Sequence, residues 1–110
     1  MTETETKIFL QFLKQNRVHK PELEYPFARS KGRKFRFDFA WPDQSVALEC
    51  DGGVWSGGRH TRGSGWMKDS EKLNLAATMG WRMLRCTPSQ LCTDEMMDTI
   101  KQALEYEEAA

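Results

Sequence analysis

Three acidic residues stand in a pattern that is suited to binding a divalent cation. Asp38 lies in one apolar segment, and Glu49 and Asp51 end the next one. If residues 42–45 form a tight hairpin, Asp38 faces Glu49 across two strands, with Cβ atoms about 4.5–5.5 Å apart. Like charges in opposed positions are destabilising unless a cation compensates them. Because Mg²⁺ prefers carboxylate oxygens and water as ligands, the pattern predicts a magnesium site.

The predicted metal site has a further candidate ligand and an alternative metal, and the acids also have an interpretation without a metal. The backbone carbonyl of Cys50 is a candidate additional ligand, and Mn²⁺ is an alternative occupant of the same oxygen-rich site. In the other interpretation, the acids lie on a solvated strand face or pair with Lys34 and Arg36.

Alternating apolar and polar residues indicate the strands that must position these acids. Over residues 34–41 the aromatic side chains form one row, which we expect to face the core: Phe35, Phe37, Phe39 and Trp41. Residues 42–44 form a turn, residues 45–51 a second strand, and residues 81–86 a third.

Helical periodicity surrounds these strands. Residues 4–16 carry an apolar stripe formed by Ile8, Phe9, Phe12 and Leu13, and Thr4 or Thr6 is the expected cap. Residues 67–79 form a second helix, ended by Gly80, with one face made by Asp69, Lys72, Leu73, Ala76 and Ala77. Residues 87–90 form a turn, and Thr93 caps a last helix to about Tyr106, whose inward stripe is Met96, Met97, Ile100, Ala103 and Leu104. This order predicts an α/β sandwich in which helices flank a small mixed sheet.

The composition narrows the class of protein. The chain has 110 residues, of which 39% are hydrophobic and 29% charged. This length predicts one domain, spanning residues 1–110. We expect no membrane partner because no apolar run reaches the roughly 18 residues of a membrane span. The polar N-terminus and three cysteines without a CxxC pair favour a cytoplasmic protein with neither a disulfide scaffold nor a structural zinc site.

Zero formal net charge conceals a strong asymmetry. Residues 14–36 hold eight bases and two acids, whereas residues 94–108 hold six acids and one base. A basic stretch of this kind favours contact with the phosphate backbone of DNA. The candidate DNA-binding residues in it are Lys31, Arg33, Lys34 and Arg36.

The acids and their context resemble a known family. Asp38 followed by Glu49-Cys50-Asp51 resembles the metal-binding core of the PD-(D/E)xK nuclease superfamily. The strings FRFDFAWPDQSVALECDGG and DSEKLNLAATMGWRMLRCT, with a loop histidine between them, resemble the small stand-alone branch related to the very-short-patch repair endonucleases. Similar compact chains are often phage-encoded, and such a chain would act in the cytoplasm of the bacterial host.

The resemblance implies a restriction-endonuclease-like fold and metal-dependent phosphodiester hydrolysis. Asp38 and Glu49 match the metal-binding acids, whereas Asp51 stands where the family has its lysine, and the related branch often has an acid there. Lys72 is our first candidate to replace that lysine, by orienting water or stabilising the transition state; the alternative is a simple ion pair with Asp69. His60 is the second candidate, because the related enzymes use a histidine in this region for proton transfer. Glu5 has a counterpart that approaches the metal site in related chains, and a capping role is the alternative.

The segment 52–65 holds six of the eight glycines and is expected to be a functional loop. Arg59 and Arg62 suit contacts with DNA phosphates because a guanidinium matches their oxygens. Trp55 and Trp66 could stack on bases or cover the edge of the core.

These features together predict a Mg²⁺-dependent DNA endonuclease. Asp38, Glu49 and Asp51 with Lys72 and His60 are its candidate catalytic residues. Cleavage specific for a branch, flap or junction, or only weakly specific for sequence, fits a chain this small, and a homodimer suits such substrates. The alternatives are a catalytically silent DNA-binding or assembly module on the same fold and a general interaction domain that uses the acidic tail.

Overall fold

A computed structural model describes residues 1–51 and 64–105 of the chain. Its centre is a four-stranded sheet in the order β1-β2-β3-β4. The first three strands are antiparallel neighbours, and β4 pairs parallel to β3. The strands are β1 (Glu22–Tyr25), β2 (Phe37–Trp41), β3 (Val46–Cys50) and β4 (Arg82–Cys86). The mixed sheet is therefore confirmed, with the segment before β2 forming an additional edge strand.

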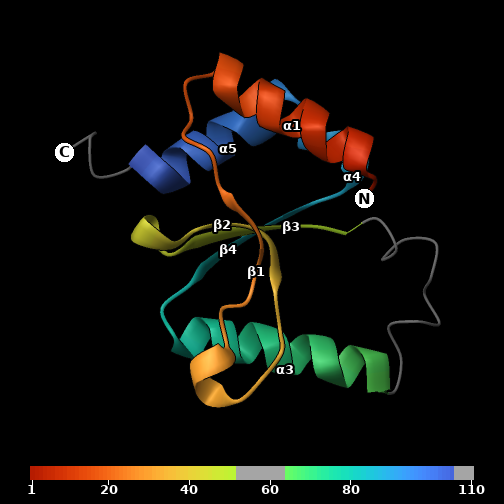
Figure 1. Cartoon of the computed structure of the whole chain (residues 1–110), viewed down its shortest axis with the longest axis vertical. Helices are drawn as coiled ribbons and strands as arrows, with labels where there is room; N and C mark the ends of the chain where they lie inside the picture. Colours follow the sequence, from red (N-terminus) through yellow and green to blue (C-terminus); the bar gives the residue numbers. More distant parts are fainter. Residues whose placement is uncertain (52–63, 106–110) are drawn as a thin grey trace.

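Helices cover both faces of this sheet (Figure 1). One face carries α1 (Glu3–Gln15), α4 (Pro88–Leu91) and α5 (Asp94–Glu105), and the other carries α3 (Ser64–Thr78). A parallel pair requires a crossover connection, and α3 lies in the connection between β3 and β4. The predicted α/β class, with a small mixed sheet between helices, is confirmed. Within 1–51 and 64–105, no helix is both long and apolar enough to span a membrane.

The larger core cluster lies between the sheet and the helices α1, α4 and α5. Phe9 of α1 packs edge-on against Phe39 of β2, with 4.8 Å between ring centroids. The indole Nε1–H of Trp41 donates a 2.9 Å hydrogen bond to the carbonyl of His19. The inward stripe predicted for α5 is confirmed, but Ile8 is 56% exposed. Its inclusion in the buried stripe of α1 was wrong, because Phe9 and Leu13 provide the buried face instead.

A second core cluster lies between the sheet and α3. Phe27 stacks on Phe37 with 3.9 Å between centroids, and Ala76 supplies the fully buried position of α3. Ala77 is exposed, so its predicted place on the packing face was wrong. The helix instead packs through Leu75, Ala76 and Met79.

The aromatic row predicted for β2 is divided between these two clusters. Phe39 and Trp41 face α1 and α5, whereas Phe35 and Phe37 pack in the cluster beside α3. The change of face falls at Asp38. The β1–β2 register places Glu24 opposite Asp38, and Glu24 has a φ of 49°. Both strands are thus irregular at the level of the acidic site, as is common near functional residues.

Several element boundaries differ from the predictions. Helix α1 begins earlier because Thr2, rather than Thr4 or Thr6, forms a capping box with Glu5. Helix α3 begins at Ser64, so the expected loop does not extend to Gly65. The expected turn after β4 is the short helix α4, whose cap Thr87 forms a second capping box. The predicted termination by Gly80, which has a φ of 88°, and the capping by Thr93 are confirmed.

Candidate functional site: acids and bases at the end of β3

The hairpin brings Asp38 and Glu49 into opposed positions, as predicted. The register pairs Phe39 with Leu48 and Ala40 with Ala47, so Asp38 lies opposite Glu49. The turn between the strands is a 3-10 turn over Pro42–Gln44, followed by Ser45 with a φ of 57°. The number of residues between the two strands therefore predicted correctly that the two acids face each other, although the turn is not a simple two-residue turn.

Two hydrogen bonds to side-chain oxygens join the strands at this level. The backbone N–H of Asp38 donates to Oε2 of Glu49 at 2.9 Å, and the N–H of Cys50 donates to Oδ2 of Asp38 at 2.8 Å. Each carboxylate therefore anchors the opposite strand. This exchange fixes both acids at the level where β2 changes face.

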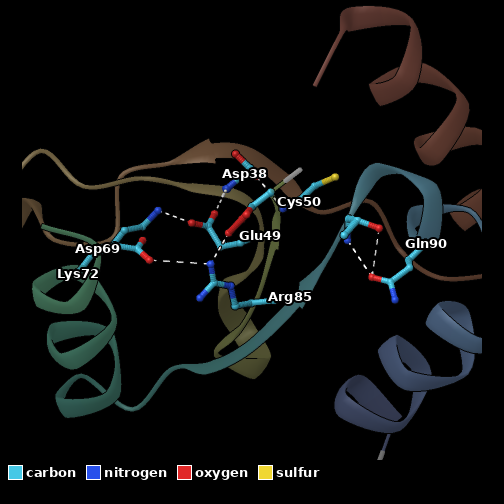
Figure 2. Close-up of polar contacts among 9 residues, drawn as sticks. Asp38, Glu49, Cys50, Asp69, Lys72, Arg85 and Gln90 are labelled. Atoms are coloured by element: carbon cyan, nitrogen blue, oxygen red, sulfur yellow. Dashed lines mark hydrogen bonds and ion pairs between the residues drawn. The ribbon is translucent and has the colours of Figure 1, made fainter. Parts of the chain in front are cut away.

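Lys72 reaches this pair from α3 and forms an ion pair with Glu49 (Figure 2). The two side chains are only 16% and 14% exposed. Burial raises the pKa of Glu49, and the hydrogen bonds from Lys72 and the Asp38 N–H oppose that rise. The Nζ atom of Lys72 also lies 5.8 Å from the centre of the Phe37 ring. The structure thus brings our first candidate for the missing lysine directly to a predicted metal-binding acid, whereas Asp69, its alternative partner, approaches Arg85.

Asp51 has a different partner. Arg85 of β4 forms an ion pair with Asp51, and its guanidinium lies 3.8 Å from Asp69 of α3. These charges raise the pKa of Arg85, with the hydrogen bond to Asp51 as the largest cause. Arg85 was absent from the predicted site. The sequence could have indicated Arg85 through its place in the predicted 81–86 strand, because parallel pairing of that strand with β3 puts Arg85 beside Glu49.

The chemistry of the donors fits a hard divalent cation. Asp38 and Glu49 offer carboxylate oxygens, and Cys50 between Glu49 and Asp51 offers a backbone carbonyl. Among residues 1–51 and 64–105, however, no group of three or more His, Cys, Asp or Glu side chains is arranged to hold a metal ion. The arrangement therefore supplies two fixed carboxylates, while Asp51 is engaged by Arg85.

Glu5 lies near this end of the sheet but has a structural partner. Its side chain accepts a 2.8 Å hydrogen bond from the N–H of Thr2, and the capping interaction lowers its pKa. Burial raises the pKa of the Cys50 thiol, and the negative charges of Asp38 and Glu5 raise it further. Glu5 is thus close enough to act on the site electrostatically, while its carboxylate caps α1.

The predicted basic residues divide into two groups. Lys31, Lys34 and Arg36 are exposed. Arg33 instead pairs with Glu71 of α3 and lies 4.5 Å from the centre of the Phe35 ring. A separate groove of about 470 Å³ runs beside α1, lined by Lys7, Leu10, Gln11, Lys14, Val18, His19 and Lys20.

Four predicted residues lie outside the described part of the chain: Trp55, Arg59, His60 and Arg62. The side chain of Trp66 is also outside it, although its backbone belongs to α3. Their roles in catalysis and DNA binding stay predictions.

Comparison with known proteins finds limited similarity. No family model matches the chain, and no solved structure matches it. Two uncharacterized proteins of Mycobacterium tuberculosis, from two strains, are each 31% identical over 64 residues. The similar region is 58% of this chain and 22% of each relative, so the chain spans about a fifth of the length of these relatives.

Proposed function

We propose that this protein is a Mg²⁺-dependent DNA endonuclease. One observation carries the proposal: Asp38 and Glu49 are opposed across a hairpin and fixed by reciprocal hydrogen bonds, with Lys72 held against Glu49. Two acids and a lysine at one end of a sheet suit metal-assisted hydrolysis of a phosphodiester. The resemblance to the PD-(D/E)xK nucleases points to the same reaction.

Each residue would have a separate role in this reaction. Asp38, Glu49 and the Cys50 carbonyl would hold Mg²⁺, which when bound would act as a Lewis acid on a phosphate oxygen. The ammonium of Lys72 would orient the attacking water or stabilise the charge that develops on the phosphate. Because Lys72 already lies against Glu49, a small shift of its flexible side chain would release the carboxylate to the metal and keep the ammonium beside it.

DNA would approach over the basic surfaces. Exposed Lys31, Lys34 and Arg36 offer unshielded positive charge, and the groove beside α1 adds Lys14 and Lys20. Such contacts release counterions from DNA, so binding should weaken steeply as salt is added. A structure-specific substrate such as a branch, flap or junction is the form that we propose, together with action in the cytoplasm and a homodimer as the assembly.

A second candidate function rests on the same cluster. Lys72 and Arg85 already pair with Glu49 and Asp51, so these two acids have cationic partners without a metal. This observation favours a catalytically silent DNA-binding or assembly module.

One experiment separates the two candidates. Labelled linear, flap, mismatched and four-way-junction DNA is incubated with Mg²⁺, Mn²⁺ or chelator. The wild type is compared with Asp38→Asn and Glu49→Gln. Asp43→Asn, which removes an exposed acid from the hairpin turn, is the matched control.

The nuclease proposal expects metal-dependent cutting by wild type and Asp43→Asn, and its loss in both site variants. Binding without cutting by the wild type would favour the silent module. Absence of binding even at low salt would reject both candidates.

A further inference from the structure

Arg85 occupies a central position between three elements of the site. It projects from β4, forms an ion pair with Asp51 directly after β3, and approaches Asp69 of α3 at 3.8 Å (Figure 2). The parallel register places Arg85 beside Glu49. One guanidinium therefore bridges the sheet and the crossover helix beside the two proposed metal-binding acids.

The ion pair with Arg85 engages a carboxylate that could otherwise enlarge the proposed metal site. Asp51 lies two residues after Glu49, so the pleat of a continued strand places both side chains toward α3. Its backbone is fixed by a 2.9 Å hydrogen bond from its N–H to the carbonyl of Cys86. Its side chain is 29% exposed and that of Arg85 is 41% exposed. Asp51 therefore has a defined backbone position and a cationic partner within a partly screened environment.

The partners of Glu49 and Asp51 differ in kind. Lys72 presents a compact ammonium on a flexible stem, which can shift when a cation takes its place. Arg85 presents one guanidinium nitrogen, Nη2, to two acids: it pairs with Asp51 and lies 3.8 Å from Asp69. The second negative charge favours the position of Arg85 beside Asp51. The geometry thus leaves Asp38 and Glu49 available to a metal while Asp51 stays engaged.

We propose that Arg85 is a positioning residue that withholds Asp51 from the metal and restricts the ligand set to Asp38, Glu49 and backbone oxygen. This inference rests on the proposed function, because it requires a metal at the first two acids. In this inference Asp51 is the ion-pair partner of Arg85 and is not a metal ligand. The inference also gives a role to the acid that stands where the PD-(D/E)xK superfamily has its lysine.

Direct binding of Mn²⁺, measured by the spin-resonance signal of the free ion, tests the inference without any measurement of cleavage. Asp51→Asn should bind Mn²⁺ as tightly as the wild type, whereas Asp38→Asn should lose binding. Arg85→Met should bind about tenfold more tightly because Asp51 is released toward the metal. The double variant Arg85→Met/Asp51→Asn should return to the wild-type affinity. Asp69→Asn is the matched control and should change the affinity less than Arg85→Met does.

The outcomes separate the inference from the function on which it rests. If Asp51→Asn loses Mn²⁺ binding to the extent seen in Asp38→Asn, Asp51 is a metal ligand. That result would overturn the inference but not the proposed metal site of the wild type. Unchanged affinity in a folded Arg85→Met would overturn it too. If Arg85→Met does not fold, Asp51→Asn alone still decides. A wild type that binds no Mn²⁺ would reject the proposed function itself and the inference with it.

Discussion

Lys72 of α3 and Glu49 of β3 form an ion pair in which neither side chain is more than 16% exposed. The pair joins the crossover helix to the strand that carries the candidate site. Because both charges are largely withdrawn from water, each depends on the other for its stabilisation. The contact is therefore a structural tie as well as a candidate part of the chemistry, and the two roles can be separated by experiment.

Substitution of Lys72 tests the structural role. Lys72→Met keeps an apolar stem near Phe37 but leaves Glu49 without its cation. We expect a loss of about 1–3 kcal/mol in the free energy of unfolding, measured by urea denaturation near neutral pH. Arg33→Met is the control, since it breaks an ion pair with Glu71 between more exposed side chains. A loss in the control as large as that in Lys72→Met would contradict the importance of burial.

The raised pKa of Glu49 predicts a dependence of stability on pH. Burial is the main cause of the rise, so the folded chain holds this proton more tightly than the unfolded chain does. The resulting stabilisation is complete below the ordinary pKa of a carboxyl and is lost as pH rises through the raised pKa. Glu49→Gln removes this loss. As pH rises above the ordinary carboxyl pKa of about 4, the variant should therefore gain stability relative to the wild type.

Urea denaturation at several pH values measures that difference. Asp43→Asn controls for the removal of one exposed carboxyl. A stability difference between Glu49→Gln and wild type that is flat, or that moves the other way with pH, would contradict the prediction.

The three cysteines should differ in reactivity. Burial raises the pKa of all three thiols, that of Cys86 to about 12, but Cys50 and Cys86 are buried whereas Cys92 is exposed. Only the thiolate is nucleophilic, so a thiol reagent near neutral pH should modify Cys92 first. We expect Cys92→Ser to abolish the fast reaction, while urea restores reaction of the other two thiols. Rapid modification of more than one thiol in the native wild type would contradict this order.

Gly80 should contribute through its backbone alone. It has a φ of 88° at the end of α3, and a Cβ added there would meet nothing within 4 Å. Gly80→Ala should therefore cost about 1–2 kcal/mol in the free energy of unfolding, the cost of a left-handed backbone for a residue with a Cβ. Gly32→Ala is the matched control, since Gly32 has a φ of 72° and equally open space. A much larger loss at Gly80 alone would mean that helix termination involves more than backbone strain.

Local patterns predicted the helices, the hairpin register and the opposed acids. Pairing of Asp38 with Glu49 depends only on alternation in two adjacent strands and the length of the turn between them. Placement of Arg85 depends instead on the parallel register of β3 and β4, which the crossover sets and which no local pattern reports.

The aromatic row of β2 is a case in which a regular local pattern gave a wrong prediction. Its periodicity was regular in the sequence, yet Phe37 faces the cluster beside α3. Asp38 and Glu49 exchange hydrogen bonds with the opposite strands at that point. A pattern of side-chain types cannot include such an interaction, because it depends on the backbone of the opposite strand.

The site also has an implied order of assembly during folding. Asp38 and Glu49 are 11 residues apart, whereas Lys72 lies 23 residues from Glu49 and Arg85 lies 34 residues from Asp51. Closing the longer loops costs more chain entropy, so the hairpin should form before its cations arrive. The nascent hairpin then carries opposed, uncompensated carboxylates. Lys72 consequently joins late, and its removal should accelerate unfolding far more than it slows folding.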